Sequence, residues 1–231
     1  MRKEVSPQTL QALAALDSCG VADAIETFSL RLRNEGFSDP TIRWVFPHAR
    51  PMLGYAFTFK IRSGDPPIRP GYYLDRTTWW TALEDSDDPK IVVIEDVDSK
   101  PGRGALVGRM HVTILKALGC CGVVTNGAIR GIQQFEKLMM PAFARNVSVS
   151  HAYVHIIETG VQVSIAGIRI NPGDLIHGDA NGLVNIPVGL ADRIPETVQK
   201  IRRREELIQR FCLSDGFTLA KLLEIVRDTR I

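Results

Sequence analysis

The sequence has 231 residues, of which 45% are hydrophobic and 23% are charged, a balance typical of a soluble globular protein with a sizeable core. Its net charge of +2 is close to neutral, which argues against direct binding to nucleic acid. No apolar run reaches the length of about 18 residues that suggests a membrane span, and the first residues lack the apolar stretch of a secretory signal. The four cysteines form no C-x-x-C pair, so we expect a reducing, cytoplasmic setting.

Two short helices are predicted at the start of the chain. Ser6 precedes a proline, a pattern typical of a helix N-cap, and three leucines spaced by three residues follow it. This helix is expected to end near Asp17, where Ser18 would cap a second helix that reaches Ile25. Residues 27–50 mix arginines with aromatic residues, and we expect an irregular surface segment with one turn of helix.

The next segments predict a strand, a loop, a helix and a second strand. Apolar and small or polar residues alternate from Leu53 to Ile61, which indicates a strand with one face in the core. Residues 63–71 are rich in proline and glycine and predict a loop. A short helix is expected over 75–83, and a buried strand over 90–96.

A strand–loop–helix–strand unit follows, and the other elements are arranged around it. A glycine-rich turn over 102–108 precedes a helical pattern that ends at Gly119, and a β-branched strand over 122–125 ends at an Asn-Gly turn. Arg130 comes shortly after this turn. The start of a helix carries backbone N–H groups without intrahelical partners and a positive dipole end. An anion could therefore contact both the amides of Gly108, Arg109, Met110 and His111 and the guanidinium of Arg130.

The rest of the chain predicts short strands and two C-terminal helices. A short helix over 132–138 and a strand over 141–144 come first, and Val147, Val149 and Tyr153 suggest a further strand. A hairpin over 161–170 and a strand over 183–186 follow. A long amphipathic helix is expected from Ile194 to Phe211, and Ser214 or Asp215 would cap a last helix.

The motifs of this chain resemble those of the RraA-like family, which includes the regulator of ribonuclease activity A and the 4-hydroxy-4-methyl-2-oxoglutarate aldolases. The pattern G-x3-A-x3-K-x-x-G-x-x-G-V-V-x-x-G-A-x-R covers residues 108–130, with Val112 where alanine is common, and residues 172–184 add a second matching run. The resemblance implies an α/β fold, a swivelling α/β/β-type domain over 1–190. Residues 191–231 would form a C-terminal helical extension packed on this domain or on a neighbouring subunit. It also implies a homo-oligomer, a trimer or a hexamer, with clefts between subunits.

The same resemblance implies a chemistry. The family's aldolases and oxaloacetate decarboxylases act on small α-keto or hydroxy acids, with Mg²⁺ or Mn²⁺ as a Lewis acid. Arg130 would grip the substrate, but the metal-binding aspartate that follows this arginine in the family is Gly131 here. Two other acidic positions of the family are Arg109 and Asn126. Because Mg²⁺ usually takes at least one carboxylate, we expect the family's metal site to be absent or rebuilt.

Two functions remain open from the sequence. One is a lyase with an altered metal site, in which Glu205 or Glu206 of a neighbouring subunit supplies an acid. The other is a non-catalytic protein that binds a small anion or a protein partner, as the ribonuclease regulator does.

Structural roles are also open for the site residues themselves. Arg130 could pair with a carboxylate such as Asp96, Asp98 or Asp179, and the amides at residues 108–111 could form a plain helix cap. His151 and His155 have the spacing of a zinc pair on a helix, but the strand pattern around them would separate the two rings.

Overall fold

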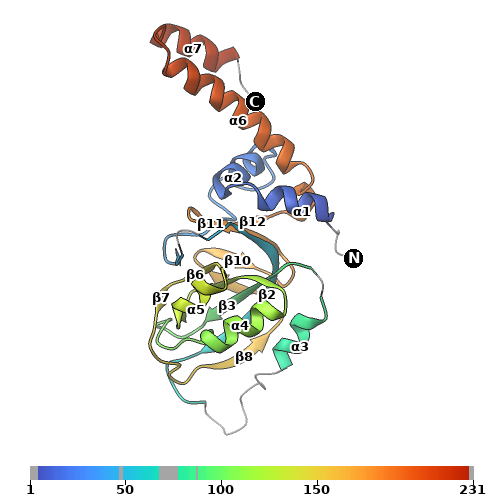
Figure 1. The fold of residues 1–231 in the computed structure, drawn as a ribbon, viewed down its shortest axis with the longest axis vertical. Helices are drawn as coiled ribbons and strands as arrows, with labels where there is room; N and C mark the ends of the chain where they lie inside the picture. Colours follow the sequence, from blue (N-terminus) through green and yellow to red (C-terminus); the bar gives the residue numbers. More distant parts are fainter. Residues whose placement is uncertain (1–4, 47–48, 68–77, 87, 229–231) are drawn as a thin grey trace.

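A mixed sheet of eight strands runs through the body of the protein (Figure 1). The computed structural model describes residues 5–46, 49–67, 78–86 and 88–228. The strand order is β1-β6-β4-β3-β2-β11-β12, and β8 also pairs with β2. The central strands β2, β3, β4 and β6 are parallel, whereas β1, β8, β11 and β12 pair antiparallel. These strands are β1 (Arg43–Trp44), β2 (Met52–Arg62), β3 (Lys90–Asp96), β4 (Cys120–Thr125), β6 (Ala142–Ala144), β8 (His155–Thr159), β11 (Leu175–Asp179) and β12 (Gly182–Ile186).

Two smaller sheets and a set of helices complete the described chain. The two-stranded sheets pair β5 (Ala128–Ile129) with β7 (Asn146–Val147), and β9 (Val163–Ile165) with β10 (Ile168–Ile170). The helices are α1 (Pro7–Ala14), α2 (Ser18–Thr27), α3 (Thr78–Glu84), α4 (Arg109–Ala117), α5 (Ile132–Lys137), the 3₁₀ turn η1 (Val188–Leu190), α6 (Ile194–Cys212) and α7 (Leu219–Asp228).

Three apolar clusters hold these elements together. Helices α3, α4 and α5 cover one face of the parallel strands, where Leu115 and Phe135 are fully buried. The β9–β10 hairpin covers the other face through residues such as Ile165. The third cluster joins α1, α2 and α6 to β11 and β12. Because β3 and β4 are buried on both faces, their sequences carry apolar runs in place of a simple alternation. Strand β2 does alternate in sequence, but it too is buried on both faces, so the prediction that only one of its faces lies in the core is wrong.

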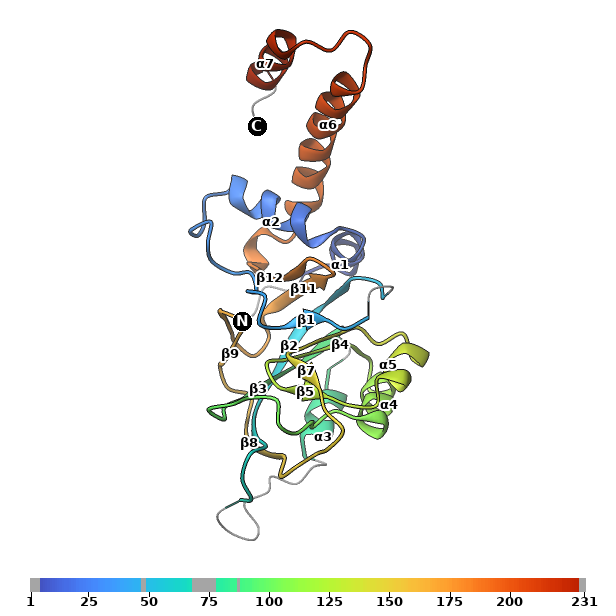
Figure 2. The ribbon, with the colours of Figure 1, turned by 90° about the vertical axis from the view of Figure 1, so that its left-hand side faces the viewer.

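Helix α6 projects away from the sheet, and α7 folds back beside its far end (Figure 2). Only Ile194 and Val198 of α6 are buried, and both lie in its first half, where α6 packs on α2. None of the described residues of α7 is buried. The mixed α/β class with C-terminal helices, expected from the family resemblance, is therefore present. None of the described helices is long and apolar enough to cross a bilayer.

Several predicted helix boundaries are wrong because other side chains supply the caps. Asp17, not Ser18, caps α2 by accepting a hydrogen bond from the Gly20 amide at 2.8 Å. Ser18 lies inside the helix, where its hydroxyl donates to Asp179 at 2.6 Å. The last helix begins after Thr218, four residues beyond Ser214, and the Thr218 hydroxyl accepts from the Lys221 amide.

Two other predictions also fail locally. The strand suggested by the valines near position 149 stops at Val147, and residues 148–154 form a loop before β8. Thr27 ends α2, and the described part of 28–50 contains turns and the two-residue strand β1 but no helical turn. The predicted helix over 75–83 begins at Thr78 in the structure, and residues 75–77 lie outside the described ranges.

Candidate functional site

A pocket of about 570 Å³ opens where α4 and α5 begin. The loops that follow β3, β5 and β7 converge there, because the parallel strands β3 and β4 end at the same edge of the sheet. Backbone pairing between β5 and β7 brings in the segment after Val147, with the Ser148 amide bonded to the Ile129 carbonyl at 3.0 Å. The lining residues are Arg109, Arg130, Gly131, Ile132, Gln133, Gln134, Lys137, Val147, Ser148 and Val149.

The position of Arg130 is set by its backbone and by a neighbouring glycine. Its amide donates to the Val107 carbonyl at 3.1 Å, which holds it beside the residue that caps α4. A Cβ atom placed on Gly108 would lie 3.0 Å from Cγ of Arg130 and 3.5 Å from its Nε. The Arg130 side chain therefore runs directly across Gly108, and the predicted convergence of these two residues is present in the structure.

The carboxylates that could have paired with Arg130 are engaged elsewhere. Asp96 accepts hydrogen bonds from the Ser63 hydroxyl at 3.0 Å and the Gly102 amide at 2.9 Å. Asp98 accepts from the Ser63 amide at 2.7 Å, and Asp179 accepts from Ser18. Within the described ranges, no ion pair includes Arg130. Its guanidinium is thus available to an external anion.

Asp96 has a structural role in building the site. Burial raises the pKa of this carboxyl group, because only 1% of the residue is exposed. Its bonds to Ser63 and to the Gly102 amide tie the loop after β3 to the end of β2. The Asn126 side chain bonds both backbone groups of Asp96, at 2.7 and 3.0 Å, and so joins the ends of β3 and β4. These bonds hold the two loops that carry Gly108 and Arg130.

The predicted residues at the start of α4 separate into two groups. Gly108 caps the helix without a side-chain hydrogen bond, and Arg109 lines the pocket. Met110 is 63% exposed and lies outside the lining. His111 is only 3% exposed, and its ring stacks on Trp79 with centroids 6.2 Å apart. We therefore omit the side chains of Met110 and His111 from the candidate site.

The pocket has the electrostatics of an anion site. Arg109, Arg130 and Lys137 bring three cationic side chains to one hollow, and none of the described lining residues is acidic. The glutamine amides of Gln133 and Gln134 and the Ser148 hydroxyl add neutral donors. Sequence reasoning missed Lys137 and Ser148. Ser148 is brought to the pocket by a pairing of two-residue strands, which leaves no readable signal in the sequence.

The donor set of this pocket does not fit the divalent metal that the resemblance implies. Mg²⁺ and Mn²⁺ prefer carboxylate and other oxygen ligands, whereas the charged groups among the described residues of this lining are all cations. A Cβ atom on Gly131 would lie 3.3 Å from the Arg109 amide, so the position of the family's aspartate lies directly beside Arg109. Elsewhere in the described chain, no three His, Cys, Asp or Glu side chains are grouped for metal binding.

The other candidate residues lie outside the pocket. His151 hydrogen-bonds the Ala105 carbonyl at 2.6 Å, and His155 bonds the Tyr153 carbonyl at 2.7 Å. Both rings thus have backbone partners. Glu205 and Glu206 lie on α6, at the opposite end of the molecule from α4 and α5 (Figure 2). Within one chain they cannot reach the pocket.

The adjacent cysteines Cys120 and Cys121 have structural roles. The structure leaves both thiols free of disulfides, and Cys121 Sγ lies 3.1 Å from the carbonyl oxygens of Leu53 and Lys90. Burial raises the pKa of Cys120 and of Cys121 to about 12. Both therefore remain protonated and unreactive near neutral pH.

Comparisons with known proteins identify the relatives of this chain. A family model described as RraA-like, Aldolase/RraA, matches residues 18–185. A putative 4-hydroxy-4-methyl-2-oxoglutarate aldolase of Halalkalibacterium halodurans is 31% identical over 59% of this chain and 65% of its own length, so the match spans just under two thirds of that relative. An uncharacterized protein of Methanocaldococcus jannaschii is 27% identical over 73% of this chain and 76% of its own length.

Solved structures share the fold. An uncharacterized protein from Pseudomonas syringae superposes with a TM-score of 0.72 at 22% identity, over 96% of this chain and 95% of its own. Streptomyces coelicolor RraAS2, described as an unusual member of the RNase ES inhibitor RraA family, superposes with a TM-score of 0.70 at 20% identity. That match covers 90% of this chain and 99% of the Streptomyces protein.

Proposed function

Since the chain belongs to the RraA-like family, we propose that its basic pocket binds a small α-keto or hydroxy acid and that the protein is a C–C lyase of the aldolase or decarboxylase type. The observation that carries the proposal is the position of Arg130, which lies across Gly108 at the start of α4 with no carboxylate partner in the described chain. Arg109 and Lys137 add positive charge around the same hollow.

Binding would begin with the substrate carboxylate. A guanidinium presents paired N–H donors that match the two oxygens of a carboxylate, and this pairing orients the ligand as well as holding it. Arg130 is the best placed of the two arginines for this role, because its backbone is bonded to Val107. Arg109 is exposed at the first position of α4, beside Gly131, and would contact the other end of a ligand that carries two acidic groups.

Decarboxylation fits the pocket better than aldol cleavage. In oxaloacetate the C3–C4 bond would break, its electron pair would move to the keto oxygen, and CO₂ would leave. The resulting pyruvate enolate would then take a proton from solvent at C3. Guanidinium N–H groups aimed at the keto oxygen would stabilise the negative charge that develops there. Aldol cleavage additionally needs a base for the substrate hydroxyl, and none of the described residues that line the pocket is an aspartate, glutamate or histidine.

A Lewis-acid metal would normally stabilise this enolate in the family, and we assign no step to one here, because the lining, as far as the structure describes it, supplies no carboxylate ligand. Loss of several kcal/mol of charge stabilisation would slow the reaction by powers of ten relative to a metal-dependent enzyme. We therefore expect a slow decarboxylase.

A second candidate is a non-catalytic member that binds a small anion or a protein partner. The absence of acidic and histidine side chains among the described lining residues favours it, since such groups would be needed for proton transfer in most lyase reactions. A homo-oligomer, a trimer or a hexamer, is part of both proposals. In either case Glu205 or Glu206 could act only at the pocket of a neighbouring copy.

The test is pyruvate release from oxaloacetate and from 4-hydroxy-4-methyl-2-oxoglutarate, measured with added Mg²⁺ or Mn²⁺ and with a chelator. We expect oxaloacetate to react faster than its spontaneous rate in the presence of the chelator. Arg130→Ala should abolish the excess rate. Arg103→Ala changes an exposed arginine of the loop between β3 and α4, outside the pocket lining, and should retain the excess rate. Pyruvate release at the spontaneous rate, together with Arg130-dependent oxaloacetate binding, would select the non-catalytic candidate.

A further inference from the structure

The cations of the basic pocket lie at two separate places along α5. Arg130 comes directly before Gly131, the N-cap of α5, and a Cβ atom on Gly131 would lie 3.3 Å from the Arg109 amide. Both arginines are therefore at the start of α5. Lys137 is the last residue of this helix. At a rise of about 1.5 Å per residue, Ile132 and Lys137 are about 7.5 Å apart along the helix axis. The pocket thus has positive charge at both ends of α5.

One face of α5 connects these two ends. Gln133 and Lys137 both line the pocket and are exposed, and residues four positions apart lie on the same face of a helix. Because helix side chains lean toward the N-terminus, Lys137 extends back over Gln133 and into the pocket. The helix itself is held in place by Phe135, which is fully buried, and by Gln134, whose amide donates to the Thr113 hydroxyl of α4 at 3.1 Å.

Lys137 is free to bind an external anion. Within the described ranges its ammonium group has no ion pair. A lysine in the last turn of a helix also interacts favourably with the carbonyl end of the helix, and Lys116 occupies the same position in α4. Lys116 does not line the pocket, however. The two lysines therefore share the helix-end role and differ in their access to the pocket.

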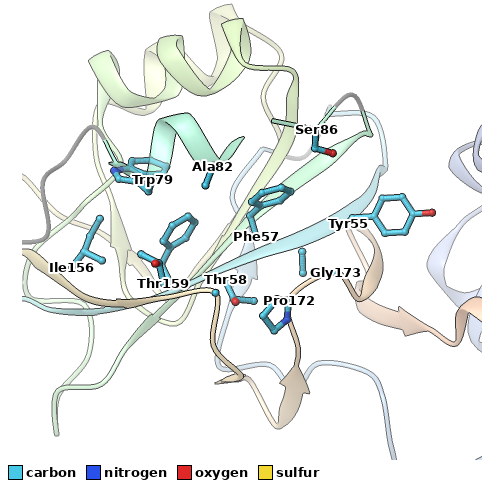
Figure 3. Close-up of a pocket in the computed structure, with 13 residues that line it drawn as sticks. Tyr55, Phe57, Thr58, Trp79, Ala82, Ser86, Ile156, Thr159, Pro172 and Gly173 are labelled. Atoms are coloured by element: carbon cyan, nitrogen blue, oxygen red, sulfur yellow. The ribbon is translucent and has the colours of Figure 1, made fainter. Parts of the chain in front are cut away.

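The charge of this pocket sets it apart from a second hollow of about 370 Å³ among β2, α3 and β8 (Figure 3). That hollow is lined by aromatic residues such as Phe57 and Trp79, and none of its described lining residues is charged. A carboxylate that leaves water needs a compensating partner. The basic pocket offers such a partner at each end of α5, so it suits an acid with two well-separated carboxylates.

We propose that Lys137 is a specificity-determining residue that binds a second carboxylate at the far end of the substrate. This inference rests on the proposed function, in which Arg130 holds the carboxylate next to the keto or hydroxyl group. A short dianion such as oxalate reaches only the arginines at the start of α5. A longer diacid such as 2-oxoadipate reaches Lys137 as well, and the pocket of about 570 Å³ has room for it.

The test is calorimetric titration of the full chain with three probes. 2-Oxoadipate carries a keto acid at one end and a carboxylate at the other. 2-Oxohexanoate has the same chain length without the distal carboxylate, and oxalate has the same charge as 2-oxoadipate without its length. The distal carboxylate of 2-oxoadipate is not on the carbon next to the keto group, so the probe cannot lose CO₂ by the route proposed above and reports binding alone.

The variant Lys137→Met removes the charge from an exposed position and keeps the length of the side chain. We expect it to weaken 2-oxoadipate binding roughly three- to tenfold, the effect of one accessible charged contact, and to leave oxalate and 2-oxohexanoate affinities unchanged. Lys137→Arg should retain 2-oxoadipate binding. Lys116→Met, which removes the matching lysine of α4, should change none of the three affinities. Arg130→Ala should weaken the binding of all three probes.

Two results would overturn the role of Lys137 alone. One is an equal 2-oxoadipate affinity in the wild type and in Lys137→Met, with Arg130-dependent oxalate binding retained. The other is an equal loss of oxalate and 2-oxoadipate affinity in Lys137→Met, which would show a general effect of charge in place of a contact at the far end. Binding of no probe in an Arg130-dependent manner would overturn the proposed function as well.

Discussion

At the scale of single residues, the site depends on the absence of a side chain at position 108. Gly108 has an extended backbone (φ −127°, ψ −167°) that any residue can adopt, so an added methyl group would act only through contact. That methyl would lie 3.0 Å from Cγ of Arg130 and displace the guanidinium. Gly108→Ala should therefore weaken anion binding about tenfold with little change in unfolding temperature.

The control for this prediction is Gly189→Ala, where an added Cβ meets no atom within 4 Å. Calorimetric titration with oxaloacetate measures the affinity, and thermal unfolding measures stability. Equal affinities in the two alanine variants would show that Arg130 does not depend on Gly108 for its position.

Arg109 and Gly131 also act as a pair. Gly131 has φ +65°, a conformation that aspartate tolerates better than most residues, and its missing side chain would lie beside Arg109. An aspartate introduced there alone should pair with Arg109 and bind no metal. We predict that Gly131→Asp leaves Mn²⁺ binding undetectable, whereas Gly131→Asp combined with Arg109→Glu gains it, as measured by Mn²⁺ electron paramagnetic resonance. Equal Mn²⁺ binding by the single and double variants would contradict this account.

These residues differ in how far the sequence could reveal them. Arg130 and Gly108 belong to one strand–helix–strand unit, so their proximity follows from a local pattern. Lys137 lines the same pocket because α5 is short, and Ser148 lines it because β5 pairs with β7. Neither feature leaves a periodic pattern in the sequence. The sequence places His111 near the site only through its position in the first turn of the helix, whereas its side chain packs into the core against Trp79.

At the scale of elements, a buried histidine fastens the first two helices to the sheet. His177 lies on β11 with no exposed surface, and its Nε2 bonds the Leu16 carbonyl at 3.1 Å, at the junction of α1 and α2. Burial lowers the pKa of His177 below its usual 6.5. As the pH falls below 6.5, His177 takes up a proton in the unfolded chain before it does so in the folded chain. Its contribution to the free energy of unfolding is therefore fully present above pH 6.5 and is lost as the pH falls toward the lower pKa of the folded state.

We therefore predict that the free energy of unfolding falls between pH 6.5 and pH 5, by at most about 1.4 kcal/mol per pH unit from this residue. His177→Gln should be less stable at pH 8 and should lose that part of the pH dependence. His151→Asn is the control, because His151 is only partly buried. Denaturant unfolding at several pH values is the measurement, and a slope unchanged by His177→Gln would contradict the assignment.

The elements that the sequence predicted well are those with long regular patterns. The alternation from Leu53 to Ile61 marks β2, and the apolar period after Ile194 marks α6. The caps were predicted less well, because Asp17 and Ser18 both suit the start of a helix and only the contact with Asp179 separates their roles. The valines near position 149 suggested a strand, yet Val149 is 95% exposed and has no strand to pair with in the described chain.

At the scale of the whole molecule, α6 and α7 form an arm that stands away from the sheet (Figure 2). Three leucines on this arm are between 46% and 88% exposed, namely Leu213, Leu219 and Leu223. Exposing this much apolar side-chain surface to water is unfavourable for an isolated chain. The homo-oligomer expected from the family would cover such a surface. We predict that Leu219→Lys combined with Leu223→Lys lowers the mass measured by light scattering. A wild-type protein with the mass of one chain would contradict the prediction.

The central claim is that one small anion contacts both Arg130 and the start of α4. Calorimetric titration with oxalate, a dianion that resembles the pyruvate enolate, tests it most directly. We predict saturable binding to the wild type and to Arg103→Ala, and binding roughly 10- to 100-fold weaker to Arg130→Ala, as expected for the loss of a charged hydrogen-bonded pair. Equal oxalate affinity in the wild type and in a folded Arg130→Ala variant would contradict the claim.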